Sequence, residues 1–171
     1  MLKLISKKTK DLKQSEIIHI CKLKNTQWKY SFKSQLFWFR KNNFKSDIHN
    51  LLLFDKKIIG YTSLRVRYYK HSNYKGKFLL FDSLIINRKF RKKNYSTLLM
   101  NFNNKTIISK KKFSFLICEK KMVDFYKKFK WNKMIKLTYR ILDHSTAKIG
   151  MVFNKDKLKN SKKKVNLNFK K

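Results

Sequence analysis

One short segment of the chain combines cations, small polar residues and the start of a helical pattern. Residues 91–96 read R-K-K-N-Y-S and follow the apolar strand pattern Phe78–Ile86. If a helix begins in this segment, free backbone N–H groups and the positive end of the helix dipole point at one place. Sites that hold a phosphate or pyrophosphate are built in this way. The segment therefore predicts an enzyme that binds a phosphorylated cofactor.

Asp82 is the second residue that could do chemistry, because it interrupts the apolar strand pattern ahead of the basic segment. A carboxylate in the centre of a sheet is costly unless it is paired or functional. Asp82 could bind an ammonium substrate and take its proton, or it could form an ion pair with one of the many lysines. Neighbouring strand residues point to opposite faces, so we expect Asp82 rather than Ser83 to face a cleft.

The elements that must position these residues follow from the periodicity of apolar residues. Four helical patterns are present. The first begins near Asp11 and Gln14, which resemble a capping box, and the second covers Ser31–Lys41. The third places Tyr95, Leu98, Leu99 and Phe102 on one face, and the fourth does the same with Met122, Phe125, Tyr126 and Phe129. Strand patterns cover Leu2–Ile5, Ile48–Phe54, Ile58–Tyr68, Phe78–Ile86, Phe113–Cys118, Met134–Leu142 and Ala147–Phe153. The order β-α-α-β-β-β-α-β-α-β-β predicts a mixed sheet covered by helices.

The connections between these elements are also predicted. Asp55–Lys57 has the length of a hairpin turn, a polar loop is expected over His71–Lys77, and another turn is expected at Asp143–Thr146. Arg65 and Arg67 alternate with apolar residues, which predicts a strand with one solvated face. These arginines could line a substrate site, but a solvated face is the simpler explanation.

The net charge is the most extreme property of the composition. The chain has 171 residues and a formal net charge of +36, which permits a nucleic-acid or anionic-membrane partner. However, the chain has no Pro, three Gly and a single Ala, and its commonest residues have AT-rich codons. Residues 155–171 hold eight Lys and one Asp, which leaves +29 on residues 1–154, so the charge is spread along the chain. We therefore favour solvated basic faces over a nucleic-acid partner.

Length and apolar content fit one domain, expected over residues 1–154, followed by a basic, flexible C-terminal tail over 155–171. No apolar run approaches the ~18–20 residues of a membrane span, and no signal-peptide pattern is expected at the N-terminus. Cys21 and Cys118 are expected to be reduced core residues of a cytoplasmic protein. The His and Cys spacing does not indicate a metal site.

The basic segment resembles the cofactor motif of the GNAT superfamily of acyl-CoA-dependent N-acetyltransferases. That motif is a strand followed by Arg or Gln, two residues, Gly, one residue, and Gly or Ala. Asn94 and Ser96 stand in place of the two small residues; Asn is the non-glycine residue that best tolerates a left-handed backbone, and Ser is small. The matching residues are Arg91, Lys92, Lys93, Asn94, Tyr95 and Ser96, with Leu98 and Leu99 in the helix behind them.

A second stretch resembles the same family. Its fifth strand is followed by a helix that ends in a phrase like F-Y-x-x-x-G-F/W, and residues 125–131 read F-Y-K-K-F-K-W, with Lys130 in the Gly place. The resemblance implies that Tyr126 is the general acid that protonates the thiolate of departing CoA. A phenol with a pKa of about 10 can donate a proton to a thiolate of about 8.5 at close range. The alternative is that Tyr126 only packs in the apolar stripe.

The resemblance covers roughly residues 1–154 and implies a fold. This fold is α/β (α+β), with a mixed, mostly antiparallel sheet of six to seven strands, helices on both faces, and strands 4 and 5 splayed apart. Backbone amides of residues 91–96 would hold the pyrophosphate of acetyl-CoA. The strand edge at Leu84, Ile85 and Ile86 would pair with the pantetheine arm and polarise the thioester carbonyl.

The resemblance also implies direct transfer of an acetyl group from acetyl-CoA to a primary amine, which Asp82 would orient and deprotonate. The acceptor stays open among amino sugars, polyamines, aminoglycosides, protein N-termini and lysines. Trp28, Trp38 and Tyr30 give a slight preference for a sugar, because their rings could stack on it. A monomer or homodimer is expected. The alternatives are a small basic nucleic-acid-binding protein and a catalytically silent CoA-binding relative.

Overall fold

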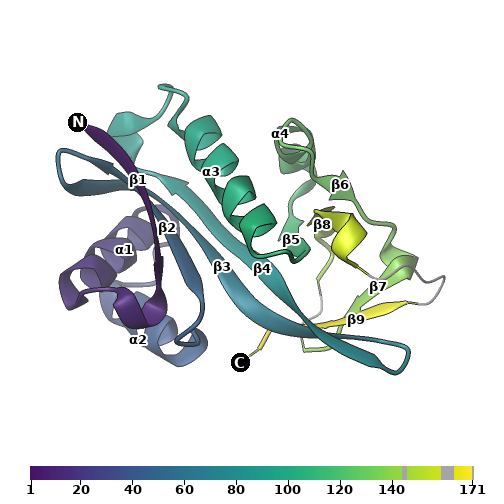
Figure 1. The fold of residues 1–171 in the computed structure, drawn as a ribbon. Helices are drawn as coiled ribbons and strands as arrows, with labels where there is room; N and C mark the ends of the chain where they lie inside the picture. The colour runs from purple at the N-terminus through teal and green to yellow at the C-terminus, as the bar shows by residue number, and fades with distance from the viewer. Residues whose placement is uncertain (144–145, 159–163, 171) are drawn as a thin grey trace. The chain divides into compact units, whose positions relative to one another are not determined.

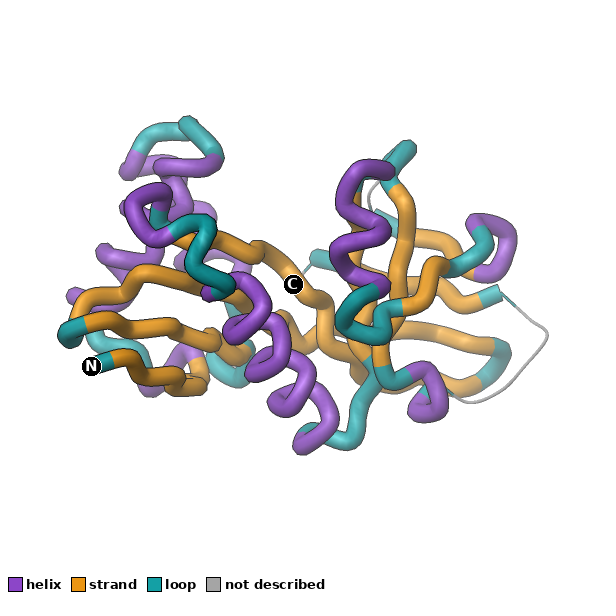
Figure 2. The backbone as a smooth tube through the Cα atoms, turned by 90° about the horizontal axis from the view of Figure 1, so that it is seen from above, coloured by secondary structure: helices purple, strands orange, loops and turns teal. Residues whose placement is uncertain are grey.

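The computed structural model describes residues 1–143, 146–158 and 164–170. In these residues the backbone forms nine strands and four α-helices, joined by short 3-10 turns (Figures 1 and 2). The helices are α1 (Gln14–Gln27), α2 (Phe32–Asn42), α3 (Tyr95–Ser109) and α4 (Val123–Lys127). The strands are β1 (Leu2–Lys8), β2 (Ile48–Phe54), β3 (Lys57–His71), β4 (Tyr74–Ile86), β5 (Ser114–Cys118), β6 (Asn132–Lys133), β7 (Tyr139–Ile141), β8 (Ile149–Phe153) and β9 (Val165–Asn168).

The strand pairing gives a mixed and mostly antiparallel sheet, as predicted. The order is β1-β2-β3-β4-β5-β8-β6, with β9 paired to β3 and β7. The pair β4–β5 is parallel and joins Leu79 and Leu80 to Ser114 and Phe115. The sheet has nine strands in the described residues rather than six or seven. The additional β6 and β9 have two and four residues, which is too short for apolar periodicity to reveal them.

The chain divides into two compact units, which we describe separately. Unit 1 is built from Met1–Arg65 and Asp82–Asn103, and unit 2 from Val66–Phe81 and the chain after Asn103. The long strands β3 and β4 each contribute one part to unit 1 and the other part to unit 2. None of the described helices combines the length and apolar character needed to cross a membrane.

Unit 1 has helices on both faces of its strands, as predicted. Leu51 and Leu52 are neighbours on β2 and point to opposite faces. Leu51 belongs to the core under α1 and α2, whereas Leu52 packs with Leu99 of α3. Figure 1 shows α1 and α2 on one side of these strands and α3 on the other. The strands are closely packed at Gly60, where a Cβ would lie 2.8 Å from Ile86 Cδ1 and 3.1 Å from Leu52 Cβ.

The starts of α1 and α2 show which capping predictions hold. The predicted cap at Asp11 is wrong, because α1 begins at Gln14 and its capping box joins Lys13 to Glu16, with Lys13 N–H donating to Glu16 Oε2 at 2.8 Å. Asp11 instead ends a 3-10 turn. The start of the second helix at Ser31 is confirmed, because the Ser31 hydroxyl accepts a hydrogen bond from Ser34 N–H at 3.2 Å.

The two hairpins of the long strands differ in how well they were predicted. The turn between β2 and β3 is confirmed, with left-handed Asp55 (φ 47°) and Lys56 (φ 63°) as its two central residues, which suits a tight hairpin. The predicted loop over His71–Lys77 is wrong, because β4 already begins at Tyr74. Aromatic contacts extend this hairpin, since the rings of Tyr69 and Tyr74 lie 5.9 Å apart.

The predicted solvated face of β3 is wrong. Arg65 is 7% exposed and Arg67 is fully buried, whereas the neighbouring Tyr68 is half exposed. Backbone carbonyls accept from both guanidinium groups, since Arg65 Nη2 donates to Asn42 O at 3.2 Å and Arg67 Nε donates to Phe169 O at 2.9 Å. Such partners offset part of the cost of burying a cation, and the alternation of residue types does not reveal them.

Unit 2 contains an aromatic core that is packed between β5, β8 and β9. The predicted strand Ala147–Phe153 is confirmed as β8 from Ile149, whereas Met134–Leu142 forms a 3-10 turn and the short β7 instead of one strand. The expected turn at Asp143–Thr146 falls partly on His144 and Ser145, which lie outside the described residues.

The prediction of a loose C-terminal tail is wrong for its last part. β9 pairs with β3 and β7, and its Val165 and Leu167 are buried at 5% and 1% exposure. Alternate apolar residues on a strand bury one face. In this lysine-rich segment, two such residues are enough to bury one face of β9. The boundary of a domain at residue 154 stays a prediction.

Candidate functional site

Strand β4 changes its geometry at Asp82 and Ser83, in unit 1. Ser83 has a left-handed backbone (φ 72°) inside the strand. The Ser63 hydroxyl donates to the Asp82 carbonyl, and Ser83 Oγ lies 3.4 Å from Asp82 Oδ1. The prediction that Asp82 and Ser83 point to opposite faces is therefore wrong, because a left-handed residue breaks the two-residue period as in a β-bulge. Such strain in a strand is typical of functional sites.

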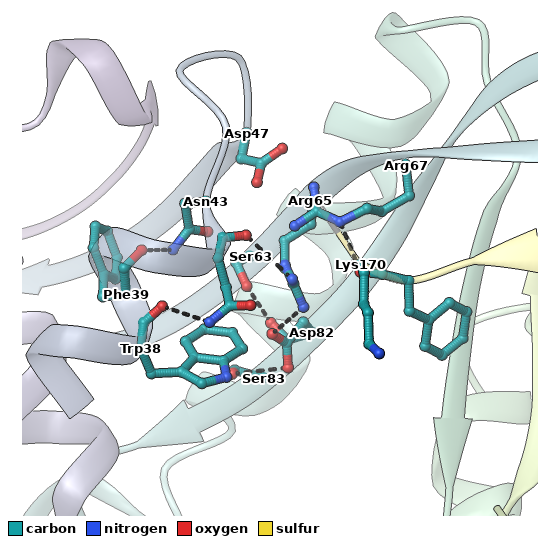
Figure 3. Close-up of polar contacts among 12 residues, drawn as sticks. Trp38, Phe39, Asn43, Asp47, Ser63, Arg65, Arg67, Asp82, Ser83 and Lys170 are labelled. Carbon is teal, nitrogen blue, oxygen red and sulfur yellow. Dashed lines mark hydrogen bonds and ion pairs between the residues drawn. The ribbon is translucent and has the colours of Figure 1, made fainter. Parts of the chain in front are cut away.

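The partner of Asp82 is an arginine rather than a lysine. Arg65 Nη1 lies 3.4 Å from Asp82 Oδ2, and the Arg65 guanidinium carbon lies 4.9 Å from the centre of the Trp38 ring. Figure 3 shows this pair with Trp38 beside it. The Arg65 side chain is 8% exposed and that of Asp82 is 31% exposed. Asp82 is therefore a carboxylate that both contacts a buried cation and reaches solvent.

A buried hydrogen-bonded chain lies on the same face of the strands, and the sequence did not reveal it. His49 Nδ1 lies 2.8 Å from the Tyr61 hydroxyl, and His49 Nε2 lies 2.9 Å from Thr9 Oγ1. Burial lowers the pKa of His49 to about 3, with a further lowering by the charge of Lys24, and burial raises the pKa of Tyr61. Both groups are therefore neutral near pH 7. They stand within apolar strand patterns, where no spacing signal marks them.

The basic segment forms a turn that exposes helix amides. Lys92 (φ 63°) and Asn94 (φ 54°) are left-handed, as predicted for Asn94, and α3 begins at Tyr95. The bond from Leu98 N–H to Asn94 O, at 3.1 Å, is of the intrahelical type. The amides of Tyr95 and Ser96 lie in the first turn, where a helix offers no carbonyl to accept from them. Such amides can hold an anion.

Arg91 has a different place from its lysine neighbours. Its Nε donates to Ile86 O at 3.1 Å and its Nη2 donates to Gln27 Oε1 at 2.9 Å. The side chain therefore ties the turn to the end of β4 and to α1, whereas Lys92 and Lys93 are exposed. Ile85 and Ile86 turn their side chains into the cores on the two faces of unit 1, and Leu84 is partly buried against one of them, so a ligand would contact mainly the backbone of these residues.

Tyr126 lies on α4, in unit 2, within a cluster of aromatic rings. Its ring centre lies 6.1 Å from that of Phe81 and 5.2 Å from that of Phe125, and the residue is 8% exposed. Burial, and secondarily Cys118, raises the pKa of Tyr126, so the phenol keeps its proton at neutral pH. Among the described residues its hydroxyl has no hydrogen-bond partner. Lys130, in the place of the family's glycine, is left-handed (φ 64°).

The cysteines lie where the sequence predicted. Cys21 and Cys118 are both free and buried. Burial raises the pKa of Cys21 to about 11 and also raises that of Cys118. A protonated thiol is a poor nucleophile, so neither residue is suited to covalent catalysis.

The structure thus places Asp82, Leu84–Ile86 and Arg91–Ser96 in unit 1 and Tyr126 in unit 2. The sequence predicted neither the contact of Asp82 with Arg65 nor that of Arg65 with Trp38. These residues are distant in the chain. The alternation of Arg65 with apolar residues predicted only a strand with one solvated face.

Comparisons with known proteins place this geometry in a family of folds. No protein-family model and no curated protein sequence matches the chain. Solved structures do match. YhbS of Escherichia coli, a GNAT family N-acetyltransferase in complex with CoA, has a TM-score of 0.71 and 12% identity, over 98% of this chain and 91% of that chain.

Two further structures agree. ElaA of Escherichia coli has a TM-score of 0.66 and 13% identity, over 89% of this chain and 99% of that chain. An aminoglycoside 6′-N-acetyltransferase complexed with coenzyme A has a TM-score of 0.60 and 11% identity, over 87% of this chain and 96% of that chain. The resemblance predicted from the motifs is confirmed at the level of structure: the chain has the fold of the GNAT family of N-acetyltransferases.

Proposed function

We propose that this chain is a cytoplasmic N-acetyltransferase that transfers an acetyl group from acetyl-CoA to a primary amine. The observation that carries the proposal is the turn of residues 91–96, where left-handed Lys92 and Asn94 precede the free amides of α3. The fold supports it, because two of the similar structures are acetyltransferases solved with CoA. At 11–13% identity the fold alone is shared, so the residue roles below are proposals that follow from the motif resemblance and from the contacts of these residues.

The turn would bind the diphosphate of the cofactor. The amides of Tyr95 and Ser96 would donate to phosphate oxygens, and the exposed Lys92 and Lys93 would add positive charge. Arg91 would act as a positioning residue, because its guanidinium already bonds Ile86 and Gln27. The backbone of Leu84–Ile86 would align the pantetheine arm and donate to the thioester carbonyl. The pairing of β4 with β5 involves Leu79 and Leu80 and does not engage these residues.

The chemistry would be shared between a carboxylate and a phenol. Acetyl-CoA would supply the acetyl group as a thioester with a thiolate as leaving group. Asp82 would bind the acceptor ammonium and take one of its protons, which frees the nitrogen lone pair for the new N–C bond. Tyr126 would give its hydroxyl proton to the sulfur as the C–S bond breaks. Its free hydroxyl suits this role better than a packing role, because a packed tyrosine usually bonds its hydroxyl.

Binding of the cofactor tests the turn. Acetyl-CoA at 100 times its dissociation constant should add about 2.7 kcal/mol to the free energy of unfolding, measured as a thermal shift. Asn94→Val should abolish this shift, because a β-branched residue resists a left-handed backbone. Lys111→Val is the matched control, since Lys111 is also left-handed (φ 51°) and exposed but lies at the other end of α3. Equal shifts in both variants would contradict the proposed pyrophosphate site.

Transfer to an amine tests the chemistry. Tyr126→Phe should lower turnover by one to three decades and leave acetyl-CoA binding and the melting temperature unchanged, because the hydroxyl bonds no described residue. Thiol release over a panel of amines measures this. Unchanged turnover would make Tyr126 a packing residue. Binding of acetyl-CoA with no turnover of any amine would indicate the silent relative.

The nucleic-acid alternative has its own signature. Binding through many lysines should weaken steeply with salt, whereas acetyl-CoA held by backbone amides and the pantetheine arm should lose less affinity. Titrations at 50 and 200 mM salt with a mixed-sequence oligonucleotide and with acetyl-CoA distinguish the two. An acetyl-CoA affinity that falls as steeply as that of the oligonucleotide would favour the nucleic-acid alternative.

A further inference from the structure

A second buried cation lies on the same aromatic ring as Arg65. Lys24 of α1 is 6% exposed, and its Nζ lies 4.1 Å from the centre of the Trp38 ring. No carboxylate or carbonyl of the described residues accepts a hydrogen bond from this ammonium. Burial lowers the pKa of Lys24, Arg65 lowers it further, and the charge of Asp82 opposes both effects. The electrostatic interactions of Lys24 thus include both members of the Arg65–Asp82 pair.

The cluster of Lys24, Trp38, Arg65 and Asp82 therefore holds two buried cations and one carboxylate. The carboxylate lies 3.4 Å from Arg65, and the ammonium of Lys24 contacts the Trp38 ring face and receives only longer-range stabilisation from the charge of Asp82. A cation–π contact offsets only part of the desolvation of an ammonium. The cluster is not sealed, because the side chain of Asp82 is 31% exposed and Trp38 is half-buried. Lys24 thus lacks a hydrogen-bonded anion among the described residues, beside a carboxylate that solvent reaches.

A ligand anion would give the ammonium of Lys24 a hydrogen-bonded partner. The ammonium of Lys24 has three donors, and the guanidinium of Arg65 has five. A carboxylate on the acceptor could accept from Lys24 while the acceptor's ammonium contacts Asp82. A plain alkyl amine or an uncharged amino sugar would leave Lys24 without an anion, and a sugar would find the Trp38 ring already stacked by cations.

We propose that Lys24, together with Arg65 and Trp38, recognises a carboxylate of the acceptor, so that the substrate class is an amino acid rather than a simple amine. This inference rests on the proposed acetyl transfer for its placement of the amine at Asp82. Lys24 is then a specificity-determining residue: it binds a part of the acceptor that does not react, and it has no role in the proton transfers.

Matched acceptor pairs test this proposal. Thiol release is measured at saturating acetyl-CoA with phenylalanine against 2-phenylethylamine, and with lysine against cadaverine, since each pair differs by one carboxylate. The amino acid of each pair should have a kcat/KM at least tenfold higher. Lys24→Met should raise the KM of the amino acids at least tenfold and change the KM of the amines much less. Lys22→Met, on the exposed side of the same helix, should change neither.

Stability and product binding keep the test independent of catalysis. Lys24→Met should raise the melting temperature, because a similar apolar side chain removes an unpaired buried charge. Ligand-observed NMR should show N-acetylphenylalanine binding and N-acetyl-2-phenylethylamine not binding, with the difference lost in Lys24→Met. This holds whether or not any amine is turned over. Failure of acetyl-CoA binding would overturn the proposed function alone.

Three results would overturn the carboxylate proposal itself. The first is equal or better kinetics with the decarboxylated amines. The second is a Lys24→Met variant that affects amines and amino acids alike, which would mean a general packing role. The third is equal binding of the two N-acetyl compounds to the unmodified protein.

Discussion

The two faces of β2 and β3 in unit 1 carry buried polar clusters of opposite character. On the face of α3, Asn50 Nδ2 and Thr62 Oγ1 both donate to Asn103 Oδ1, at 2.9 and 3.0 Å. All three residues are fully buried and uncharged. On the face of α1 and α2, the cluster around Asp82 and Arg65 is charged, and Asp82 reaches solvent.

This difference separates a structural polar cluster from a candidate site. The neutral network fixes the position of a helix on a sheet through bonds within the protein, although Asn103 Nδ2 has no hydrogen-bond partner in the described residues. A charged cluster with a partly exposed carboxylate can be reached by a ligand, so a ligand can change its energy. Buried polar residues therefore occur on both faces of unit 1, and the α1 and α2 face combines them with charge and access to solvent.

The largest expected effect comes from Asp82, on the α1 and α2 face. Asp82→Asn should lower turnover by about two to four decades, because it removes the proposed proton acceptor, and acetyl-CoA binding should not change. Thiol release and the acetyl-CoA thermal shift measure the two properties. Asp11→Asn, an exposed acid in the same unit, is the control. A variant that keeps full turnover would reduce the open cluster to a structural ion pair.

The next effect is a pH dependence of the free energy of unfolding, caused by His49 on the α1 and α2 face. The pKa of His49 is lowered from 6.5 to about 3, so below pH 6.5 the unfolded chain binds a proton that the folded chain does not. Stability from this group is complete above pH 6.5 and falls by about 1.4 kcal/mol per pH unit towards pH 3. Urea unfolding at pH 7 and pH 5 should show a smaller difference for His49→Gln than for the unmodified protein. The exposed His19→Gln serves as control, and an equal difference in His49→Gln would show that His49 is not the cause.

The smallest effect tests the neutral cluster on the α3 face. Asn103→Leu should lower the free energy of unfolding by about 1–3 kcal/mol, because it removes the acceptor of Thr62 and Asn50 and leaves buried donors behind. Turnover per folded molecule should not change. Denaturant unfolding and thiol release check the two statements. Loss of turnover at full stability would show that the α3 face also takes part in function and would remove the contrast between the faces.

The left-handed residues explain why the family motifs are hard to see in this chain. Every left-handed residue in the described part of the chain is something other than glycine, including Asn94 and Lys130 at the two motif positions. A glycine is kept at residue 60, where a Cβ would collide with Ile86 and Leu52. Left-handed strain costs roughly 1–2 kcal/mol for most residues, whereas a collision with core atoms cannot be relieved so readily.

The sequence by itself determined most elements and the order in which they occur. The bounds of β2 were predicted as Ile48–Phe54, and the start of α3 directly after the basic segment was also predicted. Apolar periodicity reports the geometry of one element and which of its faces is buried. The phosphate-binding prediction had the same basis, because a strand, a turn and a helix start follow one another in the chain.

Only the tertiary structure decided which charges meet. Lys24, Trp38, Arg65 and Asp82 come from α1, α2, β3 and β4. The local pattern marked Asp82 as a candidate and Arg65 as solvated, but it did not show that these residues lie together. The left-handed backbone of Ser83 and the buried strand β9 were not predicted for the same reason. Burial of a charge depends on partners brought together by folding, and the pattern of a single segment contains no record of those partners.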